Sequence, residues 1–479
     1  YGKETMRSLP FNLKARLMAE IRVMLLDPNG SMTKTADAYS EFTEEVFVPY
    51  CEGFDRKLEK LLQDGTPQQL MDLADELDRV MMKHFRLVRY GIPVHNLGMN
   101  LITNYMLKRW LGERAQTRLF PVLVGGLEHK TSETNRRIYE LAELVREHAG
   151  LLETINSTPS NDLYGILSSR DTESAQLFLS WFDEFLHDFG VRGFTREIYY
   201  PRWEEEPGYV FDILKSLVSE ECRNVSDQES ILRRKRAKAE AIVEEALKNQ
   251  RFGPIKLTLF NTILGVSRTY ISFRENQRFN LDRWITRNRK LFLALGKQLR
   301  DQGYLENTDD IFFLYRKEIR RILKGKSNLT PSQVASKASE RHADFKKYED
   351  VTPPKFLHGD REFNDPLPDS KDALRGIPAS HGVVTGTVRI LTKIEDIPQV
   401  KSGDILVVPR TDPGWTPVFS KIGGLVTETG GILSHGAVVS REFGIPAVTN
   451  IRNACQTLSS GQVVTLDGNQ GVVIPESGE

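Results

Sequence analysis

A histidine in a glycine-rich segment has the best setting for covalent chemistry in this chain. Residues 427–448 read as a strand, a turn at Gly430 and Gly431, and a helix that begins after Ser434, so His435 falls in its first turn. The glycines let the backbone approach a ligand, and Ser434 is a typical N-cap. The free N–H groups of a helix N-terminus favour an anionic phosphoryl group, and the same field disfavours the imidazolium form of a nucleophilic histidine. A phosphohistidine here would be stabilised and still reactive, but a histidine that only fills a helix-start turn would show the same spacing.

Two arginines on a predicted helix could bind the oxygens of such a phosphoryl group. Arg274 and Arg278 are four residues apart and therefore project from one helix face. Between Arg268 and Lys290 the chain has seven basic and two acidic residues, a local surplus of five. Guanidinium groups bind phosphate oxygens in pairs and offset charge that develops during transfer. An exposed basic helix face is the alternative interpretation.

A polar turn at residues 188–207 is a third candidate. It follows an apolar helical segment and places Arg192, Glu197 and Arg202 among glycines. These side chains could bind a substrate, but they equally suit a turn that salt bridges close. The pattern alone leaves both interpretations open.

Apolar residues at helical spacing predict the elements that carry the arginines. They recur with this period from about residue 10 to residue 322, with a first helix at 13–26 and a long one at 259–302. Their apolar stripes indicate core packing. We therefore expect a large, mainly helical domain at residues 1–323.

The remaining third of the chain has a different texture. Residues 324–374 are rich in proline and polar residues and read as a linker with one helix at 331–348. Short β-branched runs between turn residues follow, with one helix at 433–443, and they predict a small α/β domain at 375–479. The expected fold class is multidomain α + α/β.

Composition excludes several classes of protein. The chain has 479 residues with 65 Lys and Arg and 65 Asp and Glu, so no net positive charge supports bulk binding to nucleic acid. The sequence has no run of 18 apolar residues, the length that predicts a membrane span. Cys51, Cys222 and Cys455 form neither a disulfide framework nor a zinc motif. They favour a reducing compartment, and we expect a cytoplasmic protein without a metal-ligand cluster of its own.

The histidine segment resembles the phosphohistidine signature of the swivelling, or mobile, domain of phosphoenolpyruvate-utilising enzymes. In residues 427–448 the pattern Gly-Gly, two residues, Ser, His and a helix ending in Arg-Glu-Phe-Gly-Ile-Pro-Ala-Val runs without a gap. Residues 404–419 are most similar to the rifampicin phosphotransferase branch of that family. Arg-Glu-x-x-Arg at 274–278 and the Gly-x-Arg-Gly…Glu…Pro-Arg-Trp stretch within 188–207 resemble the acceptor domain of the same branch.

The resemblance implies a role for each candidate residue. Catalysis is implied for His435, Arg274 and Arg278. Phosphate binding is implied for the turn and N-cap residues Gly430, Gly431 and Ser434. Substrate binding is implied for residues of the polar turn and of a loop beside the histidine, namely Arg192, Glu197, Arg202, Thr411, Asp412 and Trp415. For the last three, a Pro-Gly turn packed by the tryptophan is the alternative.

The chain departs from this family pattern in two places. Phe189 and Val191 stand where relatives often have histidines, so any role of those histidines is not carried over. His381 stands where relatives usually have a small or proline-like residue, and the sequence gives it no role.

The resemblance implies an ATP-dependent phosphotransferase of the dikinase type. The histidine would take the β-phosphoryl group of ATP, with release of AMP and phosphate, and donate it to a small-molecule hydroxyl: rifampicin, a phenol, another alcohol or pyruvate. ATP and Mg²⁺ would be bound by an ATP-grasp domain that nothing in these 479 residues resembles, placed upstream in the same polypeptide or on a separate subunit. No nucleic-acid or membrane partner is expected. A phosphoenolpyruvate-synthase-type enzyme cut short and a non-catalytic interaction protein are the alternatives.

Overall fold

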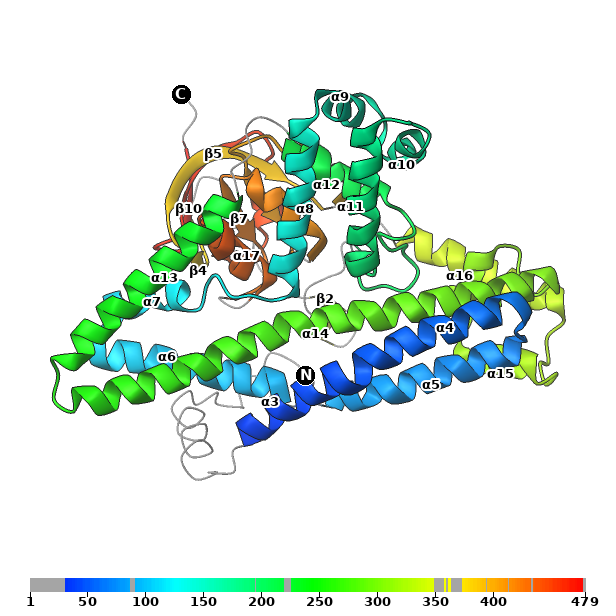
Figure 1. The fold of residues 1–479 in the computed structure, drawn as a ribbon, viewed down its shortest axis with the longest axis horizontal. Helices are drawn as coiled ribbons and strands as arrows, with labels where there is room; N and C mark the ends of the chain where they lie inside the picture. The colour runs from blue at the N-terminus through cyan, green and yellow to red at the C-terminus, as the bar shows by residue number, and fades with distance from the viewer. Residues whose placement is uncertain are drawn as a thin grey trace. The chain divides into compact units, whose positions relative to one another are not determined.

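The structure is a computed structural model that divides into two compact units (Figure 1). It describes residues 31–86, 91–193, 195–218, 225–348, 357–358, 361–362, 373–392, 394–411, 413–431 and 434–476. The helix predicted at residues 13–26 and the candidate Asp412 lie outside the described residues. The first unit comprises Tyr1–Val94, Arg196–Pro201 and Asn280–Asp365, and the second comprises His95–Thr195, Arg202–Phe279 and Pro366–Glu479.

The first unit is mainly helical. It contains the C-terminal part of α14 (Gly253–Asp301), together with α3 (Ser31–Glu41), η1 (Phe42–Phe47), α4 (Val48–Asp64), α5 (Pro67–Arg86), η3 (Thr308–Phe313), α15 (Arg316–Leu323), α16 (Pro331–Lys347), β1 (Leu357–His358) and β2 (Arg361–Glu362). On α5, the apolar side chains of Leu70, Ala74 and Leu77 recur every three or four residues and are fully buried. α4 and α5 pack along α14 (Figure 1), where Asp55 of α4 pairs with Arg287 of α14.

The helix predicted inside the linker is α16. Thr330 caps its N-terminus, because its hydroxyl accepts a hydrogen bond from the backbone of Gln333. Val334 and Ala338 of α16 are buried in the same core as α5. This part of the predicted linker is therefore packed within the first unit.

The second unit joins helices to an α/β sheet. Its helices are the N-terminal part of α14, nearly all of α6 (Ile92–Leu111), α7 (Glu113–Leu123), α8 (Lys130–Glu147), α9 (Ala149–Ser157), α10 (Ser160–Ser168), α11 (Glu173–Phe189), α12 (Gly208–Val218) and α13 (Val225–Lys248). Phe182 of α11 stacks on Phe211 of α12 with 4.5 Å between ring centroids, and both rings are fully buried. These rings belong to a core that continues into the sheet domain.

The sheet has eight described strands in the order β3-β10-β9-β5-β6-β7-β8-β4. Their bounds are β3 (Leu374–Arg375), β4 (Ile377–Ser380), β5 (Val383–Ile390), β6 (Ile405–Val408), β7 (Gly424–Thr427), β8 (Ala447–Thr449), β9 (Val463–Asp467) and β10 (Val472–Pro475). β5, β6, β7 and β8 pair in parallel, whereas the outer strands pair antiparallel. Short helices η4 (Ile394–Gln399), η5 (Pro413–Ser420), α17 (His435–Phe443) and α18 (Ala454–Thr457) connect them.

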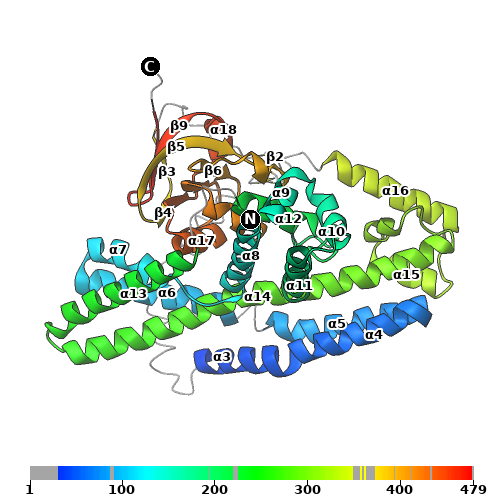
Figure 2. The same ribbon diagram turned by 45° about the horizontal axis from the view of Figure 1, so that its top comes forward.

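The continuous apolar run of β6 is explained by burial on both faces. Leu406 and Val408 point into the core shared with the helical part, whereas Ile405 and Val407 point into a second core on the opposite face. α17 contributes to the first core and α18 to the second, and Figure 2 shows these helices on opposite sides of β6. The predicted fold class, a mainly helical region followed by an α/β domain, is confirmed.

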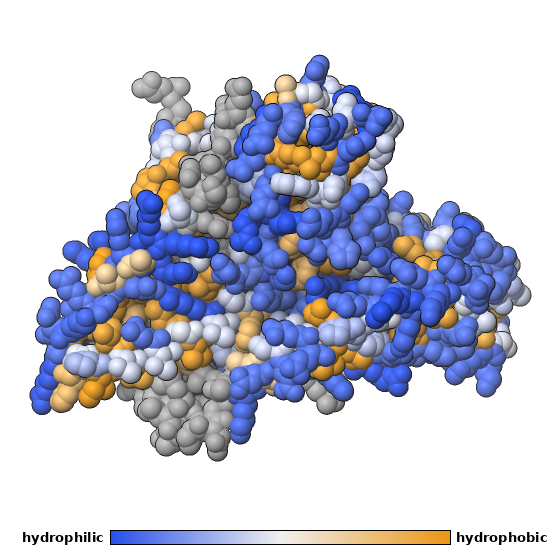
Figure 3. Space-filling view, in the orientation of Figure 1, coloured by the Kyte–Doolittle hydropathy of each residue, from blue (hydrophilic) through white to orange (hydrophobic). Residues whose placement is uncertain are grey.

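Apolar side chains also gather on one exposed face of the second unit. Ile166 of α10 and Leu177 and Trp181 of α11 are 37–42% exposed. Figure 3 shows an apolar area over these two helices.

Candidate functional site

His435 lies at the N-terminus of α17, directly after the loop that leaves β7. Ser434 is the N-cap, and its hydroxyl accepts a hydrogen bond from the backbone N–H of Ala437 at 3.4 Å. Gly430 has a φ of +131°, and a Cβ there would come within 2.9 Å of Ser434. Gly430 is thus required by the turn itself. Gly431 has open space around its α-carbon and no such constraint.

The loop before η5 reaches the first turn of α17. A Cβ on Gly436 would lie 2.6 Å from the Thr411 hydroxyl oxygen, so Thr411 contacts the helix next to His435. Trp415 is 5% exposed and belongs to the shared core. The structure therefore places Thr411 beside the histidine and gives Trp415 a packing role.

The imidazole of His435 faces a carboxylate of the helical part. Its Nδ1 lies 3.6 Å from Oε2 of Glu275 on α14, and both side chains are 1% exposed. This distance suits an ion pair and is too long for a hydrogen bond of normal geometry. α17 also packs on α13, and Figure 1 shows the two helices together. The candidate nucleophile is consequently enclosed by protein and shielded from water.

Positive charges keep Glu275 ionised despite its burial. Burial raises the pKa of the Glu275 carboxyl, but the interaction with His435 and the charges of Arg278 and His129 lower it more, to well below its usual range. Burial lowers the pKa of the Arg274 guanidinium; Glu275 opposes this shift and Arg278 adds to it. Nη1 of Arg278 is buried and donates no hydrogen bond to a described residue. Arg274 and Arg278 thus belong to the same charged cluster as His435.

The N-terminus of α8 joins this cluster. His129 is its N-cap, with Nδ1 accepting a hydrogen bond from the Ser132 backbone at 3.2 Å. The backbone N–H of Lys130 donates to Oδ1 of Asn276, the residue after Glu275, at 2.8 Å. A cavity of about 230 Å³ opens here, lined by Glu128, His129, Lys130, Ser132, Glu133, Arg136 and Asn276. Its lining is polar, which suits a hydroxyl-bearing or anionic molecule.

The polar turn at residues 188–207 reaches the same region through one arginine. Arg192 donates to the Lys130 carbonyl at 3.2 Å, and its guanidinium lies 5.1 Å from the Phe279 ring centroid. Arg202 is fully buried and donates to the Thr195 carbonyl at 2.7 Å, which indicates that it closes the turn. Glu197 is exposed, accepts a hydrogen bond from the Ile198 backbone and belongs to the first unit.

Two members of the cluster, Glu275 and His129, were not singled out from the sequence. The signal for Glu275 was its fixed place in the Arg-Glu-x-x-Arg pattern at 274–278. His129 follows a glycine-rich connection and carries no pattern of its own. Their role depends on contacts between segments far apart in the chain.

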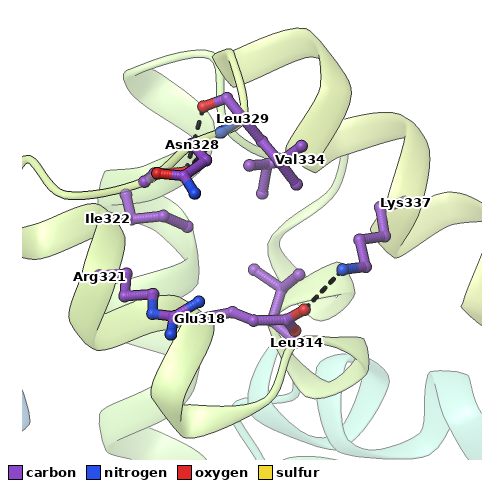
Figure 4. Close-up of a pocket in the computed structure, with 9 residues that line it drawn as sticks. Leu314, Glu318, Arg321, Ile322, Asn328, Leu329, Val334 and Lys337 are labelled. Atoms are coloured by element: carbon purple, nitrogen blue, oxygen red, sulfur yellow. Dashed lines mark hydrogen bonds and ion pairs between the residues drawn. The ribbon is translucent and has the colours of Figure 1, made fainter.

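A second cavity, of about 250 Å³, lies in the first unit between α15 and α16. Glu318 and Lys337 form an ion pair at its edge, and Leu314, Ile322 and Val334 provide apolar lining (Figure 4). None of the sequence-predicted site residues lines it.

Metal-binding side chains are not grouped in the parts of the chain that the structure describes: no three His, Cys, Asp or Glu residues are placed to hold an ion together.

None of the described helices is long and apolar enough to cross a bilayer.

Two family models match this chain. Residues 400–471 match the mobile domain of phosphoenolpyruvate-utilising enzymes, and residues 90–275 match the fourth domain of rifampicin phosphotransferases. The first range contains His435 and Thr411, and the second contains Arg192, Arg274 and Glu275. The two matched segments are therefore those that meet at the histidine.

Several named proteins are similar over most of the chain. A rifampicin phosphotransferase of Bacillus cereus is 26% identical over 90% of this chain and 49% of its own length. The prodigiosin synthesizing transferase PigC of Serratia marcescens is 30% identical over 73% of this chain and 39% of its own. The uncharacterized phosphotransferase YvkC of Bacillus subtilis is 26% identical over 88% of this chain and 51% of its own length. The chain spans about half the length, or less, of these relatives.

A solved structure of Enzyme I matches 54% of this chain at 14% identity, with a TM-score of 0.17 that carries no fold assignment. The sequence matches confirm the resemblance seen in the motifs. The chain resembles the phosphoenolpyruvate-utilising enzymes in its mobile domain and the rifampicin phosphotransferases in its helical part.

Proposed function

We propose that this chain is the acceptor and carrier part of a phosphotransferase, in which His435 delivers a phosphoryl group to the hydroxyl of a small molecule. The observation that carries the proposal is the burial of His435, at a helix N-terminus, against the Arg274-Glu275-x-x-Arg278 helix. A histidine that merely filled a turn would have no need of an ionised carboxylate and two half-buried guanidinium groups beside it.

The group is drawn from the β-phosphoryl of ATP, with AMP and phosphate as the other products. The family resemblance supports an ATP-grasp domain as the site of that step, in the same polypeptide or on a separate subunit, with Mg²⁺ bound there. His435 then moves between the two sites with its domain. One tethered nucleophile serves two sites whose chemistry is incompatible, and the tether keeps its effective concentration high at each.

At the acceptor site the transfer is an in-line displacement at phosphorus. The acceptor hydroxyl oxygen forms the new P–O bond as the N–P bond to His435 breaks, and the electron pair of that bond returns to the ring nitrogen. The hydroxyl proton is released to solvent. Arg274 and Arg278 offset the charge on the phosphoryl oxygens, a contribution of about 2.7–4 kcal/mol per well-placed donor in comparable sites.

The acceptor is proposed as a hydroxyl-bearing organic molecule, with rifampicin as the first compound to test. Several curated relatives carry rifampicin phosphotransferase as their name, while PigC is named for the synthesis of prodigiosin. The polar cavity at the start of α8, next to Asn276, is the proposed place for the reacting hydroxyl.

Labelling tests the proposal directly. The chain, together with its ATP-grasp domain, is incubated with ATP labelled at the β-phosphorus, and protein-bound label is tested for acid lability and alkali stability. We expect such label in the wild type and in a His187→Ala control, whose histidine is 88% exposed, and none in His435→Ala. Label that persists in His435→Ala would refute the assignment.

A further inference from the structure

The cavity between α15 and α16 in the first unit contains none of the residues used in the proposed transfer. Its walls come from three consecutive segments, namely α15, the connection at residues 324–330 and the first two turns of α16. Glu318 and Ile322 are four residues apart and share one face of α15. Val334 and Lys337 are three apart and share one face of α16. Figure 4 shows the lining side chains arranged around an open centre.

Part of the lining is apolar and fixed in place. Leu314, Ile322 and Val334 are 3–7% exposed and belong to the hydrophobic core of the first unit. Leu329 of the connection is 38% exposed and adds an apolar rim. The cavity volume of about 250 Å³ is below the roughly 300–1,000 Å³ of pockets that hold drug-sized molecules. The lining therefore suits the apolar body of a small molecule, such as a single aromatic ring.

The carboxylate in the lining is already paired. Glu318 accepts hydrogen bonds from Lys337 at 2.7 Å, from Arg341 at 2.7 and 3.2 Å, and from the backbone N–H of Tyr315 at 2.9 Å. Burial raises the pKa of this carboxyl, but those hydrogen bonds lower it to about 2. Glu318 is thus ionised at neutral pH, and two cations from α16 offset its charge. It needs no cation from a ligand.

Arg321 is the charged group in the lining that a ligand can pair with. It lies in the last turn of α15, in a segment at residues 316–326 that has six basic residues and one acidic residue. Its neighbours Arg316 and Arg320 pair with carboxylates of α5. Among the residues that the structure describes, Arg321 has no acidic partner. Its guanidinium is therefore available to an anion in the cavity.

The backbone beside Arg321 presents few free carbonyl oxygens to such an anion. Carbonyls at a helix C-terminus usually lack a partner and carry partial negative charge. Here the N–H group of Lys326 donates to the carbonyl of Arg321 at 2.8 Å, and that of Gly325 donates to Ile322 at 2.9 Å. Gly325 has a φ of +62°, which is typical of a residue that ends a helix in this way. The end of α15 is thus compatible with a bound carboxylate.

We propose that this cavity is a second small-molecule site, which binds an organic acid by pairing its carboxylate with Arg321 and packing its apolar body on the buried part of the lining. A guanidinium binds a carboxylate through two parallel hydrogen bonds. Arg321 and Lys337 against Glu318 give the lining a net charge of +1, which matches a monoanion. The cavity lies outside both segments that the family models match, and the inference does not depend on the proposed function.

The first experiment tests the class of ligand. The full chain, labelled with ¹³C at its Ile, Leu and Val methyl groups, is titrated with benzoate and followed by methyl NMR. We expect saturable shifts at Ile322 and Val334 with a Kd of about 1 mM or tighter. Benzamide has the ring without the charge, and acetate has the charge without the ring, so each should bind about tenfold more weakly or worse. No saturable shift at these methyls, or equal affinity for benzamide, would overturn the inference.

The second experiment tests the residue that pairs with the carboxylate. Arg321→Gln should weaken benzoate binding about tenfold or more, and Arg321→Lys should recover part of the affinity. Lys324→Gln is the matched control, because it removes the same charge three residues further along, outside the lining, and should leave the Kd unchanged. Both side chains are exposed, so neither substitution should disturb the fold. Equal losses in the two glutamine variants would indicate attraction to surface charge alone and refute the site, as would unchanged affinity in Arg321→Gln.

Discussion

His381 is expected to help hold the mobile domain against the helical part. Its Nε2–H donates to the backbone carbonyl of Thr117 on α7 at 2.8 Å, and the bond is partly buried. The sequence gives this histidine no role, because its partner lies more than 260 positions away. Replacing His381 by alanine removes the donor and leaves the carbonyl of Thr117 to water.

The size of the effect follows from the contact. One neutral hydrogen bond contributes about 0.5–1.5 kcal/mol net, and 1.4 kcal/mol corresponds to a factor of ten. His381→Ala should therefore raise the undocked fraction of the domain about 2- to 12-fold. The interface keeps other contacts, among them the apolar one of Phe443 of α17 near Tyr139 of α8, so docking should be weakened and not abolished.

Hydrogen exchange measures this fraction. Backbone amides of η5, which packs on α8 and α12, should exchange about 2- to 12-fold faster in His381→Ala if their exchange proceeds through undocking. Amides of α9 and α10 should be unaffected, and His187→Ala should match the wild type throughout. Unchanged exchange in η5, or acceleration spread over α9 and α10, would contradict a docking role.

Three further outcomes follow from single contacts. Arg278→Ala should slow transfer from labelled His435 about 10²-fold, with partial recovery in Arg278→Lys; equal single-turnover rates would argue against a catalytic arginine. Ser434→Ala should lower the free energy of unfolding by about 1 kcal/mol in urea, since it removes the cap of α17, and an unchanged midpoint would contradict this. Burial raises the pKa of Glu318, but hydrogen bonds from Arg341 and Lys337 and from the backbone lower it to about 2. Because this folded-state pKa lies below the unfolded value, the stabilisation is present above about pH 4.5 and is lost as the pH falls toward about 2. Glu318→Gln should cost about 1–3 kcal/mol at pH 7 and almost nothing at pH 2 in denaturant titrations; a constant difference would contradict the linkage.

The sequence was most informative where chemistry and local structure share one segment. The Gly-Gly-x-x-Ser-His run predicts the turn, the N-cap and the first helical residue, and the structure has all three at Gly430, Ser434 and His435. The apolar runs of the α/β domain predict β5 to β10 because β-branched residues and turn signals act over a few residues. The roles of Gly431 and of Glu197 remain predictions from the family pattern.

Local sequence patterns do not predict contacts between segments that are far apart in the chain. Glu275 looked like one acid in a basic helix, yet it is the group that His435 faces across 160 positions. Arg192 and Arg202 looked alike in one polar turn, but Arg192 reaches Lys130 at the start of α8, while Arg202 is buried in closing the turn.

The sequence by itself determined the fold class, the candidate nucleophile and the helix that would carry its phosphate ligands, because periodicity, capping and turn preferences are local properties of the chain. Only the tertiary structure decided which nitrogen of His435 meets a carboxylate and which charges surround it. Those facts depend on how helices far apart in sequence pack together, and burial then decides how strongly their charges act on one another.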